Sequence, residues 1–103
     1  MNAQMFEQIR QLKRQIIPSE KVILFGSRAR GDEREDSDWD LLILLDKPSS
    51  ATDDYDNYGF PFTEMGWNHG TYISPKIYTL AEWEKRRPSL FYKNVEQEGI
   101  EII

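Results

Sequence analysis

The chain has 103 residues, a formal net charge of −5, a single histidine and no cysteine. This length suits one domain that spans residues 1–103. The missing cysteines exclude disulfides and thiolate metal sites, and one histidine excludes a multi-histidine site. Long DNA or RNA is not an expected partner, because proteins that hold a polyanion through its phosphates usually present a basic face.

The N-terminal region has the pattern of an amphipathic helix. Apolar residues recur there at three- and four-residue spacing: Met5, Ile9, Leu12 and Ile16. We predict a helix over residues 2–17 that Pro18 ends. The region lacks the apolar core of a signal peptide, and no stretch has the length of a membrane span. We therefore expect a cytoplasmic protein without membrane contact.

Two apolar runs, residues 22–25 and 41–45, have the length and aliphatic content of buried strands, and we expect the second strand to run from about residue 39 to residue 45. Nearly all residues between them are polar. The first run ends at Gly26-Ser27, and a short helical segment, residues 27–31, is expected to follow and to end at Gly31.

Two aspartates, Asp38 and Asp40, stand at the entrance of the second predicted strand. Because side chains alternate along a strand, both point to one side and Trp39 points to the other. Two neighbouring carboxylates repel each other, and a divalent cation relieves that repulsion. Mg²⁺ fits best, since one or two carboxylates hold it together with substrate phosphates. Asp38 and Asp40 are the predicted metal ligands and catalytic residues. Ordinary surface acids at a strand entrance are the alternative.

The Gly26-Ser27 turn is a candidate phosphate-binding element. It follows a strand and precedes a helical turn, so its backbone N–H groups and the Ser27 hydroxyl are placed to hold phosphate oxygens. Gly26 allows a close approach to the backbone. Arg28 and Arg30 are further candidates for phosphate contact. The alternative is that either arginine only balances the nearby acids.

Residues 51–70 are predicted to form a helix that is broken near Gly59 and Pro61, because proline starts a helical segment but does not sit inside one. Its aromatic residues favour a role in the core over stacking on a base. These residues are Tyr55, Tyr58, Phe60 and Phe62. We expect His69 to be an exposed turn residue.

The C-terminal third contains a predicted strand over residues 71–79, with Pro75 at a bulge or sheet edge. A short helix over residues 80–87 should follow. Pro88 suits the first turn of a last helix that ends near Gly99, and residues 100–103 suit a short edge strand. The predicted architecture is a small α/β (α+β) domain with a mixed sheet of three or four strands and helices mainly on one face.

The central motif resembles the G-S-x(10)-D-x-D pattern of the DNA polymerase β-like nucleotidyltransferase superfamily, and most of all its minimal nucleotidyltransferase (MNT) branch. The matching residues are Gly26-Ser27, Arg28-Ala29-Arg30-Gly31 and Ser37-Asp38-Trp39-Asp40-Leu41. The order of elements and the ending over residues 94–100 extend the resemblance to the whole chain.

This resemblance implies the polymerase β-like nucleotidyltransferase fold. It also implies Mg²⁺-dependent transfer of a nucleotidyl group from a nucleoside triphosphate to a hydroxyl, with ATP as the expected donor and AMP as the expected group. Small MNT proteins are often the antitoxin half of HEPN/MNT toxin-antitoxin pairs. The expected acceptor is therefore a HEPN-type partner protein.

One position departs from the family pattern. Catalytic members carry a third carboxylate on the strand that corresponds to residues 71–79, where Tyr72 stands in this chain. No Asp or Glu occurs between Met65 and Ala81. A binding module that neutralises its partner by contact, without catalysis, is therefore an alternative. A homologue of antibiotic nucleotidyltransferases is a weaker one.

Overall fold

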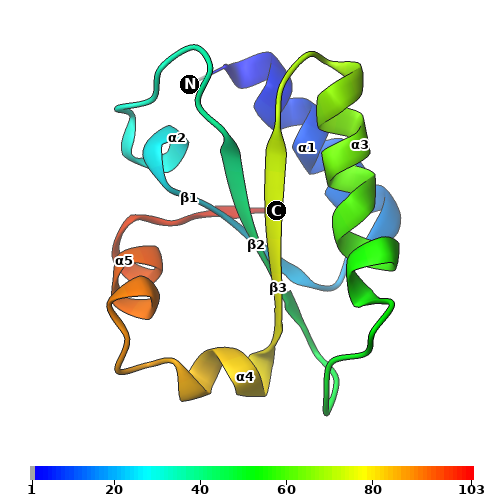
Figure 1. Ribbon diagram of the computed structural model, residues 1–103, viewed down its shortest axis with the longest axis vertical. Coiled ribbons are helices and arrows are strands. Elements are labelled where there is room, and N and C mark those ends of the chain that lie inside the picture. Colours follow the sequence, from blue (N-terminus) through cyan, green and yellow to red (C-terminus); the bar gives the residue numbers. More distant parts are fainter. Residues whose placement is uncertain (1) are drawn as a thin grey trace.

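The computed structural model describes residues 2–103, which form a four-stranded sheet with helices packed around it (Figure 1). The elements follow one another as α1 (Ala3–Ile16), β1 (Lys21–Phe25), α2 (Ser27–Arg30), β2 (Trp39–Leu45), the π-helical turn η1 (Tyr55–Gly59), α3 (Phe60–Asn68), β3 (Ile73–Thr79), α4 (Leu80–Lys85), α5 (Leu90–Glu98) and β4 (Ile100–Ile102).

The sheet has the strand order β3-β2-β1-β4. β1 pairs antiparallel with both β2 and β4, whereas β2 pairs parallel with β3. The predicted mixed sheet and α/β class are confirmed. β3 is an edge strand, which explains why it tolerates Pro75, since proline cannot donate a hydrogen bond to a neighbouring strand.

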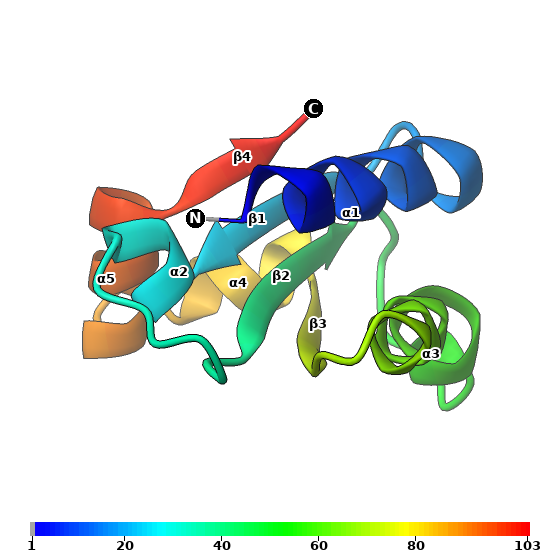
Figure 2. The ribbon, with the colours of Figure 1, turned by 90° about the horizontal axis from the view of Figure 1, so that it is seen from above.

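Helices cover both faces of this sheet (Figure 2), so the expectation that they lie mainly on one face is wrong in that detail. One core lies between the sheet and the helices α1 and α3. Its most buried members include Ile9, Leu41 and Phe62. A second core lies on the opposite face, where Leu42 and Leu44 meet the side chains of α4 and α5. Of the four predicted core aromatics only Phe62 is fully buried, while Tyr55 and Phe60 are exposed.

Local signals explain the ends of most elements. The Asn2 side chain caps α1, and the left-handed Gly31 ends α2 as predicted. The predicted break near Gly59 is instead a change from the π-helical turn to α-helix, with Pro61 in the first turn of α3. The last helix begins after Ser89, its N-cap, so Pro88 precedes that helix. Within residues 2–103, no helix combines the length and apolar character that crossing a membrane requires.

Candidate active site

Asp40 lies at the start of β2, on the face of the sheet that α4 and α5 cover, and Asp38 directly precedes this strand. Trp39 and Leu41 are buried in the core on the α1 side, whereas Leu42 belongs to the opposite core. Alternation along the strand therefore places Asp40 on the Leu42 side. Asp38 is exposed and Asp40 is half-buried.

The Gly26-Ser27 turn meets Asp40 at this end of the sheet. Phe25 pairs with Asp40 across the antiparallel β1–β2 ladder, so the next residue, Gly26, lies beside the Asp40 carboxyl group. A Cβ atom at Gly26 would collide with Oδ2 of Asp40. Gly26 also has a φ of 78° and a ψ of −159°, a conformation that essentially only glycine adopts. The turn and the acid are therefore packed together by the fold.

The negative charge of the Asp40 carboxylate is only partly compensated by the positive charges around it. Burial raises the pKa of the Asp40 carboxyl, and the negative charge of Asp38 raises it further. The positive charges of Lys76 and Arg30 act on this pKa in the opposite direction without cancelling the rise. A cation bound between the two carboxylates would remove both the repulsion and the cost of burial. This donor set, two carboxylates open to solvent, fits Mg²⁺ with phosphate oxygens completing its ligands.

Arg28 has a structural role that its sequence position did not reveal. Its side chain is buried, and its guanidinium donates to the backbone oxygens of Glu35 at 3.2 Å and Ser37 at 2.8 Å. The same group lies over the Trp39 ring, 4.6 Å from the ring centroid. Arg28 thus anchors the loop that leads to Asp38, and these contacts favour this structural role over the phosphate contact considered for it.

Arg30 is exposed and close to the acidic pair. Its guanidinium forms ion pairs with Asp32 at 3.2 Å and with Glu98 at 3.1 Å. Its charge nevertheless reaches Asp40. Arg30 therefore remains a candidate phosphate contact, whereas the contacts of Arg28 favour a structural role.

Lys76 is a member of this site that sequence reasoning missed. The parallel register pairs Asp40 with Ser74 and Leu42 with Lys76, and Ile73 and Ile77 point into the α1-side core. Lys76 therefore lies on the face of Asp40, which agrees with the effect of its charge on that carboxyl. Alternation along residues 73–79 placed Lys76 and Ser74 on one face, but only the register showed that this face carries the acids.

No third carboxylate joins the pair from β3. The backbone N–H of Trp39 donates to the Tyr72 carbonyl at 2.9 Å, so Tyr72 lies level with the start of β2. Across residues 2–103, no cluster of three or more Asp, Glu, His or Cys side chains is placed to hold a metal. The site consequently offers two carboxylates as metal ligands, and the lysine beside them supplies positive charge.

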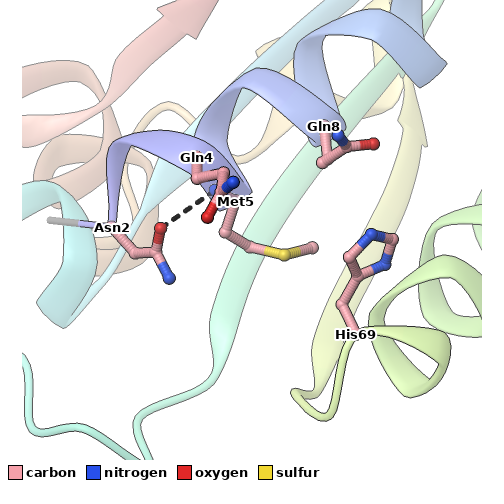
Figure 3. Close-up of a pocket in the computed structure, with 5 residues that line it drawn as sticks. All are labelled: Asn2, Gln4, Met5, Gln8 and His69. Atoms are coloured by element: carbon pink, nitrogen blue, oxygen red, sulfur yellow. Dashed lines mark hydrogen bonds between the residues drawn. The ribbon is translucent and has the colours of Figure 1, made fainter.

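A separate hollow lies between α1 and the turn after α3 (Figure 3). It is lined by Asn2, Gln4, Met5, Gln8 and His69. His69 is exposed, as predicted, and its Nδ1 lies 2.8 Å from the Met65 carbonyl at the end of α3. None of the predicted site residues lines this hollow, and its side chains carry no carboxylate.

Comparison with known proteins supports the same interpretation of the chain. A family model described as "Nucleotidyltransferase domain" matches residues 5–101. Two proteins of Methanocaldococcus jannaschii are similar in sequence. "Putative protein adenylyltransferase MJ0604" is 35% identical over 79 residues, which cover 77% of this chain and 73% of that protein. "Putative protein adenylyltransferase MJ0141" is 34% identical over 83 residues, which cover 81% of this chain and 78% of that protein.

Two solved structures share the fold. A toxin-antitoxin crystallised with AMP-PNP superposes with a TM-score of 0.64 at 17% identity, covering all of this chain and 73% of that one. A mutant of the toxin-antitoxin MntA-HpeT superposes with a TM-score of 0.61 at 15% identity. The superposition covers 95% of this chain and 72% of that one.

Proposed function

The chain belongs to the nucleotidyltransferase domain family, and on that basis we propose that it transfers a nucleotidyl group from a nucleoside triphosphate to a hydroxyl of a partner protein. The observation that carries the proposal is the contact between Gly26 and Asp40. This contact places the turn that we propose for phosphate binding beside Asp40, one of the two acids that we propose for metal binding.

In this proposal Asp38 and Asp40 hold Mg²⁺, while the Gly26-Ser27 backbone and the Ser27 hydroxyl hold the phosphates. The bound ion would polarise the phosphate oxygens and offset the charge of the departing pyrophosphate. Lys76 and Arg30 supply positive charge beside the same phosphates. Preorganised positive charge of this kind stabilises the transition state, because it is in place before the leaving group develops its charge.

The reaction exchanges one phosphorus–oxygen bond for another and releases one proton. The acceptor oxygen bonds to the α-phosphorus, and the bond from that phosphorus to the bridging oxygen of pyrophosphate breaks. The O–H bond of the acceptor breaks as well, and its proton passes to water or to the departing pyrophosphate. Without a third carboxylate on β3, the acceptor proton has no evident base among the residues of the pair. We therefore expect slow transfer that quickens as the acceptor hydroxyl becomes more acidic.

The similar proteins favour AMP as the transferred group and a toxin as the acceptor. The two sequence relatives carry the name protein adenylyltransferase. One of the solved structures contains AMP-PNP, an ATP analogue, and both are toxin-antitoxins. The second is a mutant in which two aspartates separated by one residue are replaced by glutamate, the spacing of Asp38 and Asp40. A HEPN-type toxin encoded beside this chain is the proposed acceptor, and the cytoplasm is the proposed location.

The decisive experiment uses ATP labelled at the α-phosphate, Mg²⁺ and the product of the neighbouring gene. We expect the label to move to the partner protein, and γ-labelled ATP to give none, because nucleotidyl transfer releases the β- and γ-phosphates together. Asp38→Asn should abolish the transfer, while Asp53→Asn, which removes an exposed acid outside the site, should not. Equal transfer by the wild type and by Asp38→Asn would contradict the proposal.

The absence of a third carboxylate on β3 also favours a second candidate function. If the site binds the nucleotide without transferring it, the chain is a module that neutralises its partner by contact. Mg²⁺ and ATP would then still raise the melting temperature of the wild type, since a ligand that binds only the folded state stabilises it. Partner inhibition that persists in Asp38→Asn would identify this module.

A further inference from the structure

A hollow of about 400 Å³ is lined by residues of the loop before β2 and of α3 and the turn that leads from it to β3. Figure 1 shows this loop and this turn at the upper end of the sheet. Its walls come from segments that are distant in the sequence. They are Glu35, Asp36, Trp67, Gly70, Thr71 and Tyr72. We call this hollow the edge groove. It contains none of the residues proposed to hold the metal or the phosphates.

Two exposed aromatic side chains, Trp67 and Tyr72, line the edge groove. Trp67 is 58% exposed and Tyr72 is 44% exposed, which are large values for such side chains. Phe60 holds Trp67 in an edge-to-face contact, with 5.9 Å between the ring centroids. Because the Trp67 ring is already positioned, a ligand that packs on it loses little side-chain entropy. Positioned, exposed tryptophan and tyrosine are the residues that most often anchor protein interfaces.

The charge of the edge groove selects the kind of ligand. Glu35 and Asp36 bring two exposed carboxylates to a chain whose net charge is already −5. Aromatic faces and carboxylates both attract cations, and they do so together most strongly for the planar guanidinium of arginine, which stacks and forms paired hydrogen bonds at once. Phosphate groups and acidic protein surfaces would be repelled.

The position of the edge groove connects it to the proposed reaction. Asp36 precedes Asp38 by two residues, a span of at most about 7 Å. On the other side, Tyr72 accepts the hydrogen bond from the Trp39 backbone, between the two acids. The edge groove therefore lies next to the start of β2, where the acid pair stands.

We propose that the edge groove is the docking site for an arginine side chain of the acceptor protein. The proposal rests on the proposed function in one respect only, that the acceptor is a protein. The arginine packs between the rings of Trp67 and Tyr72, pairs with Glu35 and Asp36, and so orients the acceptor at the active site.

The chain offers a direct reporter for this binding. Its three tryptophans are Trp39, Trp67 and Trp83, of which only Trp67 is exposed. In the ¹⁵N-labelled full chain, N-acetylarginine amide should shift the indole signal of Trp67 and leave the other two unchanged, with half-saturation on the order of millimolar for such a small probe. The lysine analogue should bind more weakly, and the glutamate analogue should cause no shift.

Matched variants make the test specific. The double variant Glu35→Gln/Asp36→Asn should weaken binding of the arginine probe about tenfold, since charge-assisted pairing is lost. Asp53→Asn/Glu64→Gln removes the same charge from exposed positions outside the groove and should leave the affinity unchanged. Equal affinity in both double variants, or an equal response to the glutamate analogue, would overturn the proposal. Self-association that Trp67→Ala abolishes would also overturn it, because the groove would then bind a second copy.

Failure of this inference can be told apart from failure of the proposed function. Asp38→Asn should lose nucleotidyl transfer yet keep the response of Trp67 to arginine. Arginine binding without any transfer would refute the proposed function alone. Transfer by the wild type that continues unchanged in Glu35→Gln/Asp36→Asn would refute the docking role alone.

Discussion

Gly26 packs directly against the carboxylate of Asp40, one residue beyond the cross-strand pair of Phe25 and Asp40. The contact has two requirements. The backbone needs the positive φ that glycine allows, and the carboxylate needs the space that a side chain at Gly26 would occupy. The turn and the acid therefore depend on each other, and substitutions at either residue test the arrangement.

We expect Gly26→Ala to lower the free energy of unfolding by about 1–3 kcal/mol for the backbone conformation alone, with a further loss from the collision with Asp40. Gly31→Ala is the control, because Gly31 also has a positive φ but no atom lies within 4 Å of the position that an added Cβ would take. Its loss should be about 1–2 kcal/mol. Urea unfolding measures both. In the double variant Gly26→Ala/Asp40→Gly, the part of the lost unfolding free energy that comes from the collision should be recovered. If none is recovered, the collision is unimportant.

Asp40→Asn should raise stability at neutral pH. Because the pKa of Asp40 is raised in the folded state, the unfolded chain loses this proton first as the pH rises, and the folded state then binds more protons. Its ionisation therefore lowers stability progressively from about pH 4 upward, through the folded pKa. The difference between the urea unfolding energies of Asp40→Asn and the wild type should grow with pH over this range. A difference that is flat with pH would contradict the raised pKa.

The same Asp40→Asn variant should respond differently to metal. Mg²⁺ with ATP should raise the melting temperature of the wild type, because binding to the folded state stabilises it, and should leave the variant nearly unchanged. If Asp40→Asn is more stable than the wild type but is no longer stabilised by Mg²⁺ and ATP, then Asp40 lowers the stability of the fold and is required for ligand binding.

Lys76→Gln should weaken ATP binding about two- to fivefold, the range expected for one exposed charge pair. Lys93→Gln, an exposed lysine on α5, should have no such effect. Lys76→Asp should instead strengthen binding of Mn²⁺ in the absence of nucleotide, because it adds a third carboxylate on the face of Asp40. Calorimetric titrations measure both affinities. If Lys76→Asp binds Mn²⁺ no better than Lys76→Gln, residue 76 does not reach the acid pair.

Arg28→Ala should lower the free energy of unfolding by about 2 kcal/mol, since its hydrogen bonds to Glu35 and Ser37 and its contact with Trp39 are lost together. Amide exchange in the loop before β2 should increase. Arg34→Ala removes an exposed arginine from the same loop and is the control. An Arg28→Ala variant of unchanged stability and reduced ATP affinity would instead restore Arg28 to phosphate binding.

Sequence alone determined the parts of this protein that depend on neighbours along the chain. Alternation along residues 39–45, the turn at Gly26 and the helix caps act within a few residues, so β2 was predicted with its observed ends. The continuous apolar run of β2 even contained the signal for helices on both faces, because only a strand covered twice is apolar at nearly every position.

Tertiary structure alone decided which distant residues meet. The parallel register of β2 and β3 brought Lys76 to the face of Asp40, and the fold of the loop before β2 buried Arg28 on Trp39. The edge groove likewise joins Asp36 to Trp67. Such contacts follow from strand pairing and core packing across many residues, and no local pattern specifies them.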